Sequence, residues 1–458
     1  MRLTEPGSLT ADERSFRIAK LPDGVLISYK AFADLAGKAA LFLITIFAAR
    51  RLSPQAFGVF SLGSTLGWIV AVTTDFGIQL HLARAVARQP QDAAPLLMTW
   101  LRVRLWTAAA AMAIVSIGLL AAGWSTAFSV PIAVLALVYA CSGLIELLHY
   151  FYRGLSRSEV ESTLTLWQRS ATLVCGLIAL AWWPDVTVLA CALQLPVVVT
   201  LAVSMRLATR LASGTRDEPE GTHNRILFPA RSAISAVTVL FKGADLDRPW
   251  TTFRRDVWPI GAGIVLSALY FRIDVFLVQL WSGTEAVARY NAVFRLVEAL
   301  RLFPAAVLAV ALPSLCRAGD LRPLTRVAVP TTAAAAAAAA ALWAASGWLV
   351  PFIYGEPYAG AVPAFRVLLL SFPLMSLNFA LTHQLVGWNG QRAYAAICAL
   401  ALIVNLIGNQ RLIPEWSIEG AAWATFGTEL FLTAGCVVAL WTMAVKIRGT
   451  VAGDVVMG

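Results

Sequence analysis

Arg272 and Asp274 lie inside a long apolar run, GAGIVLSALYFRIDVFLVQLW, which extends from residue 261 to residue 281. On a helix, side chains two positions apart point about 200° away from each other, so these two charges cannot simply pair. If the run crosses a bilayer, a charge that faces lipid near the centre costs at least about 2.5–3.5 kcal/mol. Each side chain therefore needs water, a partner on a neighbouring helix, or a ligand.

A second group of charges follows in NAVFRLVEALRLFP, where Arg295, Glu298 and Arg301 recur at steps of three residues and so share one stripe of a helix. Arginine is suited to the planar, bidentate recognition of phosphate and carboxylate groups. A carboxylate beside it can take up a proton or a sodium ion. Among the charges within apolar runs, we predict that Lys38, Arg272, Arg295, Arg301 and Arg366 bind substrate, and that Asp34, Asp274, Glu298 and Glu429 are ion-coupling residues.

Several of these residues also fit purely structural roles. Asp34 and Lys38 are four residues apart, a spacing that allows an ion pair within one helix. Arg295, Glu298 and Arg301 could clasp the two halves of the protein together. Arg366, close to a predicted helix end, could extend its charged group to the membrane surface. The sequence leaves both interpretations open.

The composition identifies the elements that must position these charges. The chain has 458 residues, of which 59% are hydrophobic and only 14% are charged, whereas about a quarter of a soluble protein is charged. Its mean hydropathy is +0.72. Apolar runs long enough to cross a bilayer core of ~30 Å recur along the chain, which predicts an all-α polytopic membrane protein. We expect about twelve transmembrane helices, near residues 28–49, 57–80, 100–122, 127–151, 160–182, 186–205, 256–280, 290–314, 326–350, 361–387, 393–413 and 420–445.

The distribution of arginine and lysine predicts the orientation of these helices. With both termini in the cytoplasm, the predicted cytosolic loops hold most of the basic residues, among them Arg84, Arg88, Arg153, Arg157, Arg317, Arg322 and Arg392. The predicted outer loops hold only Arg50, Arg51, Arg289 and Arg411. The net charge of +10 then reflects topology and attraction to anionic membrane lipids. We expect no nucleic-acid partner.

One long connection separates two halves of six spans each. The predicted segments are a cytosolic tail at 1–27, an N-lobe at 28–206, a basic cytosolic loop at 207–255, a C-lobe at 256–446 and a cytosolic tail at 447–458. Within the loop, apolar residues recur at helical spacing between 227 and 241, which fits either a helix on the membrane surface or a flexible linker.

The two lobes also resemble each other in sequence. AFGVFSLGSTL opens the second predicted span and VARYNAVFRLV opens the eighth, and pairing Gly58 with Ala288 aligns Phe60 with Tyr290. Both spans run in the same direction, so the repeats are parallel. Transporters built from repeats commonly bind substrate between the halves. We therefore expect a central, water-filled cavity lined by the charges described above.

Signals for an enzyme or a metal site are weak. The six cysteines form no CxxC pair, the four histidines have no metal-ligand spacing, and the chain contains no GxSxG, P-loop or HExxH motif. Asp245-Leu-Asp247 resembles a metal–nucleotide signature, but such a tripeptide is common by chance. We predict a non-enzymatic protein without a cofactor or metal site, coupled to H⁺ or Na⁺.

Six longer stretches occur in a characteristic order: ARRLSPQAFGVFSL, DFGIQLHLARAVAR, RDVWPIGAGIVLSALYFRIDVFLVQLWSG, ARYNAVFRLVEALRLFPAAVLAVALPSL, IYGEPYAGAVPAFRVLLLS and VNLIGNQRLIPEWSIEGAAWATFGTEL. Together they resemble the polysaccharide-exporter branch, which includes O-antigen-type oligosaccharide flippases, of the multidrug/oligosaccharidyl-lipid/polysaccharide (MOP) superfamily. The resemblance covers most of residues 27–446.

This resemblance implies two six-helix lobes around a cationic cavity, in the bacterial inner (plasma) membrane. It implies alternating-access transfer of polyprenyl-pyrophosphate-linked oligosaccharide for surface polysaccharide biosynthesis. Arg272, Asp274 and Arg295 match places where relatives often carry polar residues that face the cavity. Arg289 departs from the family pattern, which has a small or apolar residue there. The unusually long loop at 207–255 leaves room for a regulatory role or for partners such as other polysaccharide-assembly proteins.

Two other functions are compatible with the same sequence. A cation-coupled exporter of drugs or metabolites could use the same lobes, but it would favour an acidic or aromatic pocket over a cluster of arginines. A membrane scaffold without transport activity would use the charges only to hold its helices together. Replacing the arginines with glutamine distinguishes a scaffold, which would change in assembly, from a transporter, which would change in flux.

Overall fold

The computed structural model describes residues 23–213, 258–317 and 320–456, and this part of the chain is helical throughout, without a β-strand. Most of the predicted N-terminal tail, the apolar pattern at 227–241 and Asp245-Leu-Asp247 lie outside the described residues. Among these described residues, ten helices are long and apolar enough to cross a membrane. The difference from the expected twelve arises at two interrupted helices, described below.

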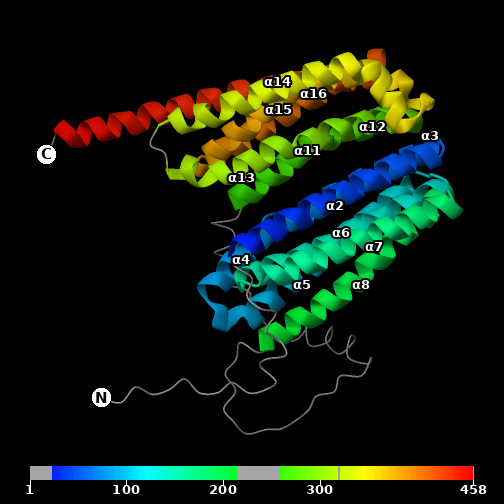
Figure 1. Ribbon diagram of the computed structural model, residues 1–458, viewed down its shortest axis with the longest axis horizontal. Helices are drawn as coiled ribbons and strands as arrows, with labels where there is room; N and C mark the ends of the chain where they lie inside the picture. The colour runs from blue at the N-terminus through cyan, green and yellow to red at the C-terminus, as the bar shows by residue number, and fades with distance from the viewer. Residues whose placement is uncertain (1–22, 214–257, 318–319, 457–458) are drawn as a thin grey trace, which may run out of the picture.

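The first half of the chain forms one group of packed helices, the N-lobe, shown in blue to green in Figure 1. Its elements are α2 (Asp23–Arg51), α3 (Pro54–Asp75), α4 (Ile78–Arg88), the 3₁₀ turn η1 (Pro90–Asp92), α5 (Ala93–Ala121), α6 (Thr126–Gly154), α7 (Ser158–Trp182) and α8 (Val186–Ser213). Within it α2 packs against α7, and α6 packs against both α3 and α8.

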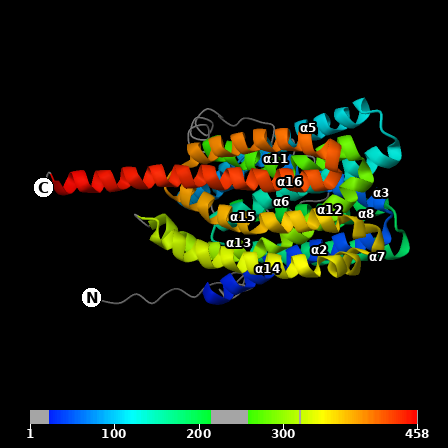
Figure 2. The same ribbon diagram turned by 90° about the horizontal axis from the view of Figure 1, so that it is seen from above.

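The second half forms the C-lobe, in which α11 and α15 both pack against α16. Its elements are α11 (Trp258–Ser282), α12 (Thr284–Leu300), α13 (Leu302–Arg317), α14 (Arg322–Tyr354), the 3₁₀ turn η2 (Glu356–Ala361), α15 (Val362–Gly387) and α16 (Gln391–Val456). The end of α16 projects beyond the other helices in Figures 1 and 2. The backbone of the predicted C-terminal tail therefore continues this helix as far as residue 456.

Local sequence explains where the second span begins and ends. Ser53 caps α3 by accepting a hydrogen bond from the Ala56 amide, and Pro54 occupies the first turn, where its missing N–H is not needed. The helix ends where Phe76 and Gly77 both adopt left-handed backbone angles, with φ of 44° and 83°. Gly77 has no Cβ and tolerates this conformation easily. The chain then turns into α4, a short amphipathic helix whose first three residues the sequence analysis had assigned to the second span.

One predicted span is divided in two, and two other predicted spans are joined in a single kinked helix. The expected eighth span, 290–314, is divided into α12 and α13 at Arg301, three residues before Pro304, which cannot donate an amide hydrogen bond. In α16, by contrast, two predicted spans are joined in one helix. Its hydrogen bonding is continuous, but it contains Ser417 with the non-helical angles φ 48° and ψ −125°. This kink follows Pro414 and separates the two spans predicted at 393–413 and 420–445.

The lobes meet along α3, which contacts both α11 and α12. At the end that carries the α2–α3 turn, called here the predicted outer end, α3 and α12 approach so closely that a Cβ on Gly58 would lie 2.1 Å from the Thr284 carbonyl oxygen. At the opposite, predicted inner end, the rings of Phe76 and Trp258 have centroids 5.1 Å apart. The residues of α3 and α11 between these two contacts position the site.

Candidate binding site between the lobes

Arg272 bridges the two lobes. Its side chain projects from α11 and is only 2% exposed. Its Nη2 donates to the Thr65 hydroxyl on α3 of the N-lobe at 3.1 Å, and to Asn291 Oδ1 on α12 at 2.7 Å. Its Nη1 is buried without a hydrogen-bond partner among the described residues. Of the three possibilities that the sequence left open, the structure shows partners on neighbouring helices, and Asp274 is not one of them.

Asp274 points into the interior of the C-lobe. It is 1% exposed and accepts hydrogen bonds from the Tyr290 hydroxyl and, at 2.8 Å, from the Val275 amide. The Tyr290 hydroxyl also lies 3.4 Å from the Thr425 hydroxyl on α16. The two side chains thus point in opposite directions from α11. Arg272 lies at the interface between the lobes, and Asp274 lies among α11, α12 and α16.

Arg295 and Glu298 form an ion pair on α12, with Nη1 and Oε2 2.7 Å apart. Their side chains are 26% and 36% exposed, so the pair is accessible from outside the packed helices. Arg295 Nε is buried and has no hydrogen-bond partner in the described part of the chain. The pair therefore offers a ligand an accessible edge, beside a buried donor that has no partner among the described residues.

Two aromatic rings lie among the predicted substrate-binding arginines of this region, which are Arg272, Arg295 and Arg301. The guanidinium carbon of Arg272 lies 4.7 Å from the centroid of the Phe294 ring, and that of Arg301 lies 4.2 Å from the centroid of Phe271. The two rings contact each other edge to face at 5.1 Å. Cation–π contacts hold guanidinium groups in place without neutralising them. With Glu298 as the carboxylate paired to Arg295, the cluster keeps an excess of positive charge.

Glu429 lies in a separate polar group inside the C-lobe. It is 3% exposed and accepts a hydrogen bond from Asn378 Nδ2 at 2.7 Å. The Thr433 hydroxyl donates to Asn378 Oδ1 at 2.8 Å. Like Asp274, this carboxylate is surrounded by oxygen and amide groups within packed helices.

Sequence reasoning missed the buried asparagines of α16. Asn405 Nδ2 donates to the Thr428 hydroxyl at 3.1 Å, and Asn409 Nδ2 donates to Asn405 Oδ1 at 2.8 Å. Two asparagines four residues apart within an apolar run were the available signal, because an amide buried in hydrocarbon requires a partner. These two asparagines, in the first half of α16, therefore add polar groups to the interior of the C-lobe near Thr425 and Thr428.

The structure does not bring the other predicted residues into the arginine cluster. Asp34 and Lys38 are both exposed on α2, and no ion pair joins them in the described part of the chain. Arg366 donates from Nε to the Ser346 hydroxyl at 2.8 Å and lies over the ring of Trp343, 4.8 Å from its centroid. It is therefore held between α14 and α15, within the C-lobe.

A further buried arginine was not predicted as a site residue. Arg104 on α5 is 1% exposed and donates from Nη2 to the Ala71 carbonyl on α3 at 2.9 Å. Asp75 and Glu146 are the carboxylates that interact with it electrostatically. Its contact with α3 indicates a role in fixing the helix that carries Thr65.

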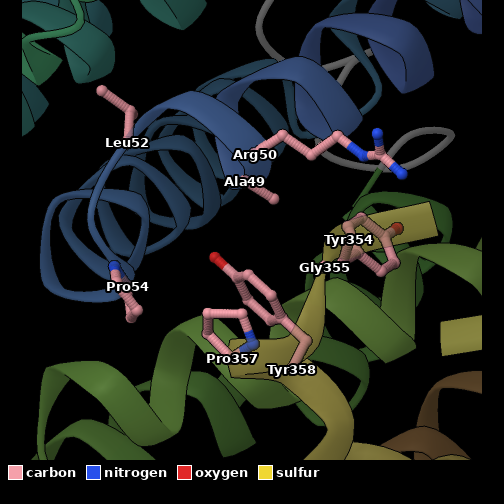
Figure 3. A pocket seen from close by; sticks show the side chains of 8 residues that line it. All are labelled: Ala49, Arg50, Leu52, Pro54, Tyr354, Gly355, Pro357 and Tyr358. Carbon is pink, nitrogen blue, oxygen red and sulfur yellow. The ribbon is translucent and has the colours of Figure 1, made fainter. Parts of the chain in front are cut away.

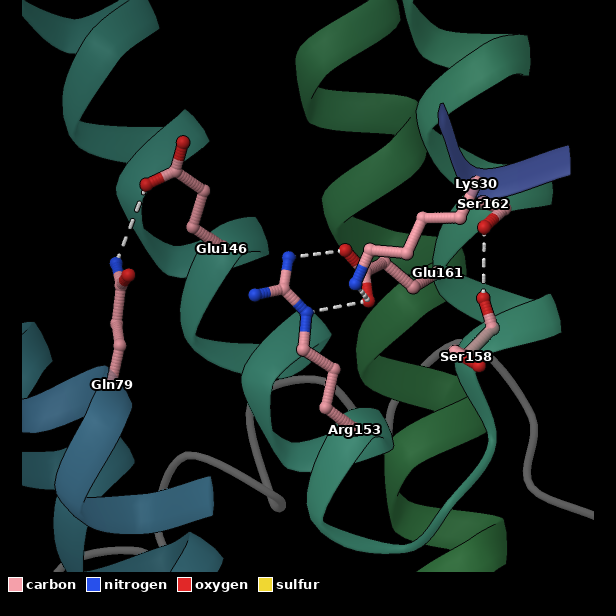
Figure 4. Close-up of polar contacts among 7 residues, drawn as sticks. All are labelled: Lys30, Gln79, Glu146, Arg153, Ser158, Glu161 and Ser162. Atoms are coloured by element: carbon pink, nitrogen blue, oxygen red, sulfur yellow. Dashed lines mark hydrogen bonds and ion pairs between the residues drawn. The ribbon is translucent and has the colours of Figure 1, made fainter. Parts of the chain in front are cut away.

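At the predicted inner end, a polar cluster ties the N-lobe together (Figure 4). Glu161, at the start of α7, accepts two hydrogen bonds from Arg153 at the end of α6, and Lys30 of α2 approaches within 3.5 Å. Beside it, Gln79 donates to Glu146 at 3.4 Å. Since Glu161 is saturated by partners from its own lobe, we interpret this cluster as structural. The described residues contain no group of three or more His, Cys, Asp or Glu that could hold a metal ion.

Comparison with protein families identifies a family to which this chain is similar. The model of the polysaccharide biosynthesis protein family matches residues 27–318, which is more than half of the chain and extends from within α2 to the end of α13. A search of curated proteins finds no significant match.

Solved structures share the fold over nearly the whole chain. An inward-facing multidrug resistance MATE family transporter of the MOP superfamily has a TM-score of 0.65 at 12% identity, covering 92% of this chain and 95% of that one. The lipid II flippase MurJ, in an inward closed conformation, has a TM-score of 0.63 at 11% identity, covering 91% and 89%. An outward-facing MATE transporter has a TM-score of 0.54 at 14% identity, covering 93% and 96%. The fold is that of MOP superfamily transporters.

Proposed function

The chain belongs to the polysaccharide biosynthesis protein family, and we propose that it is a flippase for polyprenyl-pyrophosphate-linked oligosaccharide in the bacterial inner membrane. Both termini lie in the cytoplasm in this proposal, so that the α2–α3 turn faces outward. Surface polysaccharide biosynthesis would use the transferred oligosaccharide. The family and the transporter fold support membrane transport; the substrate is inferred from the chemistry of the site.

The observation that carries the proposal is the cluster of Arg272, Arg295 and Arg301, in which Arg272 forms a hydrogen bond to the other lobe. A pyrophosphate carries two adjacent anionic groups, which match the fork of donors on a guanidinium. Arg272 Nη1 and Arg295 Nε are donors without hydrogen-bond partners in the described chain. An anion bound there would be stabilised while it crosses the low-dielectric centre, with its polyprenyl tail remaining in lipid.

The bridge from Arg272 to Thr65 connects binding to the movement of the lobes. This hydrogen bond joins α11 to α3 across the interface. An anion that binds the same guanidinium would compete with Thr65 for its N–H donors. Since a ligand shifts a conformational equilibrium only through unequal affinity for the two states, a contact at the interface is a direct way to drive alternating access.

Ion coupling by H⁺ or Na⁺ belongs to the interior of the C-lobe in this proposal. Asp274 and Glu429 are buried carboxylates close to hydroxyl and amide groups, and oxygen ligands suit a hard cation such as Na⁺. The exposed residues Asp34 and Glu298 are the alternative carboxylates. We give Lys38 and Arg366 a lesser role in substrate binding because neither lies in the arginine cluster.

Mass spectrometry of lipid extracts from cells with and without the gene tests this function. Loss of the gene is expected to raise the pool of polyprenyl-pyrophosphate oligosaccharide and to lower the surface glycan. Reintroducing the wild-type gene should reverse both changes, whereas a gene encoding Arg272→Gln and Arg301→Gln together should not. An unchanged lipid-linked pool would instead favour a small-molecule exporter built on the same lobes, to be examined by drug sensitivity.

A further inference from the structure

At the predicted outer end, Arg50 in the last turn of α2 binds the end of a helix in the other lobe. Its Nε donates to the Ile353 carbonyl at 2.7 Å, and its Nη2 donates to the Phe352 carbonyl. Both carbonyls belong to the last turn of α14, where C=O groups have no partner within the helix and carry partial negative charge. A guanidinium is well suited to two adjacent carbonyls of this kind, because its donors diverge in one plane.

The surroundings of Arg50 are built from both lobes. A pocket of about 330 Å³ is lined by Ala49, Arg50, Leu52 and Pro54 from the N-lobe and by Tyr354, Gly355, Pro357 and Tyr358 from the C-lobe. Figure 3 shows the extended Arg50 side chain on one side of this pocket and the two tyrosine rings on the other. The Phe57 ring of α3 contacts the Tyr358 ring edge to face at 5.9 Å. Movement of one lobe away from the other would separate all of these contacts.

Two tyrosine hydroxyl groups also lie at this interface. The side chains of Tyr354 and Tyr358 are each 1% exposed, and neither hydroxyl has a hydrogen-bond partner among the described residues. A buried hydroxyl without a partner is unfavourable, and it recovers hydrogen bonds when water enters. Opening would break the contacts of Arg50 and give both hydroxyl groups more access to water, so the two effects act in opposite directions.

We propose that Arg50 is a latch: by binding the last carbonyls of α14, it positions the lobes in the outward-closed arrangement, and its release accompanies exit of substrate. This role explains an arginine on the side of the membrane where basic residues are otherwise few. The inference rests on the proposed transport cycle only in requiring two arrangements of the lobes, and it does not depend on which substrate is carried.

Distance measurement between the lobes tests the latch. Spin labels are attached at Gln55→Cys and Glu356→Cys, both exposed at the predicted outer end, in a variant whose six native cysteines are replaced with serine. Wild-type protein is expected to give mainly the short, closed distance. Arg50→Gln removes two hydrogen bonds from a charged donor, and we expect the ratio of open to closed molecules to rise by about tenfold or more.

Arg51 provides a matched control. It is adjacent and exposed, and Arg51→Gln makes the same change in charge at the same end of the molecule. We expect its distance distribution to match that of the wild type. If Arg50→Gln does not fold, Arg50→Lys, which keeps the charge but lacks the fork of donors, should give a smaller shift in the same direction.

Each outcome has a definite meaning. An unchanged distance distribution in both Arg50 variants, or an equal shift in the Arg51 variant, would overturn the latch. A shift confined to the Arg50 variants supports it, even if the same protein fails to move lipid-linked oligosaccharide. In that case the latch would stand and the proposed substrate would be wrong.

Discussion

At the residue scale, Arg272 and Asp274 show how two charges in one apolar helix acquire different roles. Arg272 contacts Thr65 across the interface between lobes, whereas Asp274 binds Tyr290 inside the C-lobe. The difference follows from their separation of two positions on the helix. Arg295 on α12 and Arg301 at its end continue the group of arginines that begins with Arg272. Predictions about anion binding therefore concern these arginines, and predictions about ion coupling concern the buried carboxylates.

We expect Arg295→Gln and Arg301→Gln each to lower transport of polyprenyl-pyrophosphate oligosaccharide into proteoliposomes by roughly tenfold or more. The reason is the loss of a hydrogen bond from a charged donor, worth about 1.5–3 kcal/mol. Arg411→Gln, a change in an exposed residue of α16 remote in sequence from the cluster, serves as the control and should transport normally. Equal rates in all three variants, at equal protein level, would show that the cluster is structural.

Asp274→Asn and Glu429→Gln separate ion coupling from folding. Each replacement keeps an oxygen that can accept the hydrogen bond from Tyr290 or Asn378 but cannot carry a negative charge. We expect at least one variant to transport at a rate that no longer responds to an imposed H⁺ or Na⁺ gradient. Proteoliposomes with and without the gradient provide the measurement. If both variants still respond as the wild type does, the coupling ion binds elsewhere, with Asp34 and Glu298 as the next candidates.

At the element scale, interruptions of helices decide where side chains point. The division between α12 and α13 occurs at Arg301 itself, so the last arginine of the cluster sits at the break. The left-handed pair Phe76 and Gly77 ends α3 beside the contact with Trp258. These breaks are local features of the backbone, and their effect on stability can be measured separately from transport.

Gly77→Ala should destabilise the protein, because φ of 83° places a Cβ in a conformation that costs roughly 1–2 kcal/mol for an L-residue. Gly118→Ala is the control: this glycine lies in the last turn of α5, and an added Cβ would have no neighbour within 4 Å. Alanine there should stabilise the protein by about 0.5–1 kcal/mol. Thermal unfolding of the purified protein in detergent should therefore give shifts of opposite sign. A lower Tm for both variants would contradict the explanation.

At the scale of the whole molecule, α3 is the N-lobe helix that packs against α11 and α12 at the interface between the lobes. It approaches α12 at Gly58 and Thr284 near the predicted outer end and contacts the start of α11 near the predicted inner end. A transporter that alternates between two arrangements must loosen one of these contacts at a time. The outer contact has almost no free space, which makes it sensitive to a single methyl group.

Gly58→Ala is expected to shift the lobes toward the outward-open arrangement, since its Cβ would lie 2.1 Å from the Thr284 carbonyl oxygen, a backbone atom that cannot rotate away. Gly427→Ala, whose added Cβ would have no neighbour within 4 Å, should leave the lobes as they are. The spin-label pair at residues 55 and 356 reports both results. A wild-type distance distribution in the Gly58 variant would mean that the helices adjust locally without opening.

The sequence by itself determined that the chain is a helical membrane protein and that charges inside its spans need partners. Hydropathy and the period of the helix are local properties, so they also predicted the opposite directions of Arg272 and Asp274 and the shared stripe of Arg295, Glu298 and Arg301. Most expected spans are present, and the expected exporter family is confirmed by the match to polysaccharide biosynthesis proteins.

Only the tertiary structure decided which charges share a site. It joined Arg272 to Thr65, which lies 207 positions away in the chain, and Arg50 to α14, more than 300 positions away, while it left Lys38 and Arg366 outside the cluster. Helical period gives the face on which a side chain lies, but the neighbour that this face meets depends on how the lobes dock. Docking depends on shape, as in the close approach at Gly58, and this information is distributed over both halves of the chain.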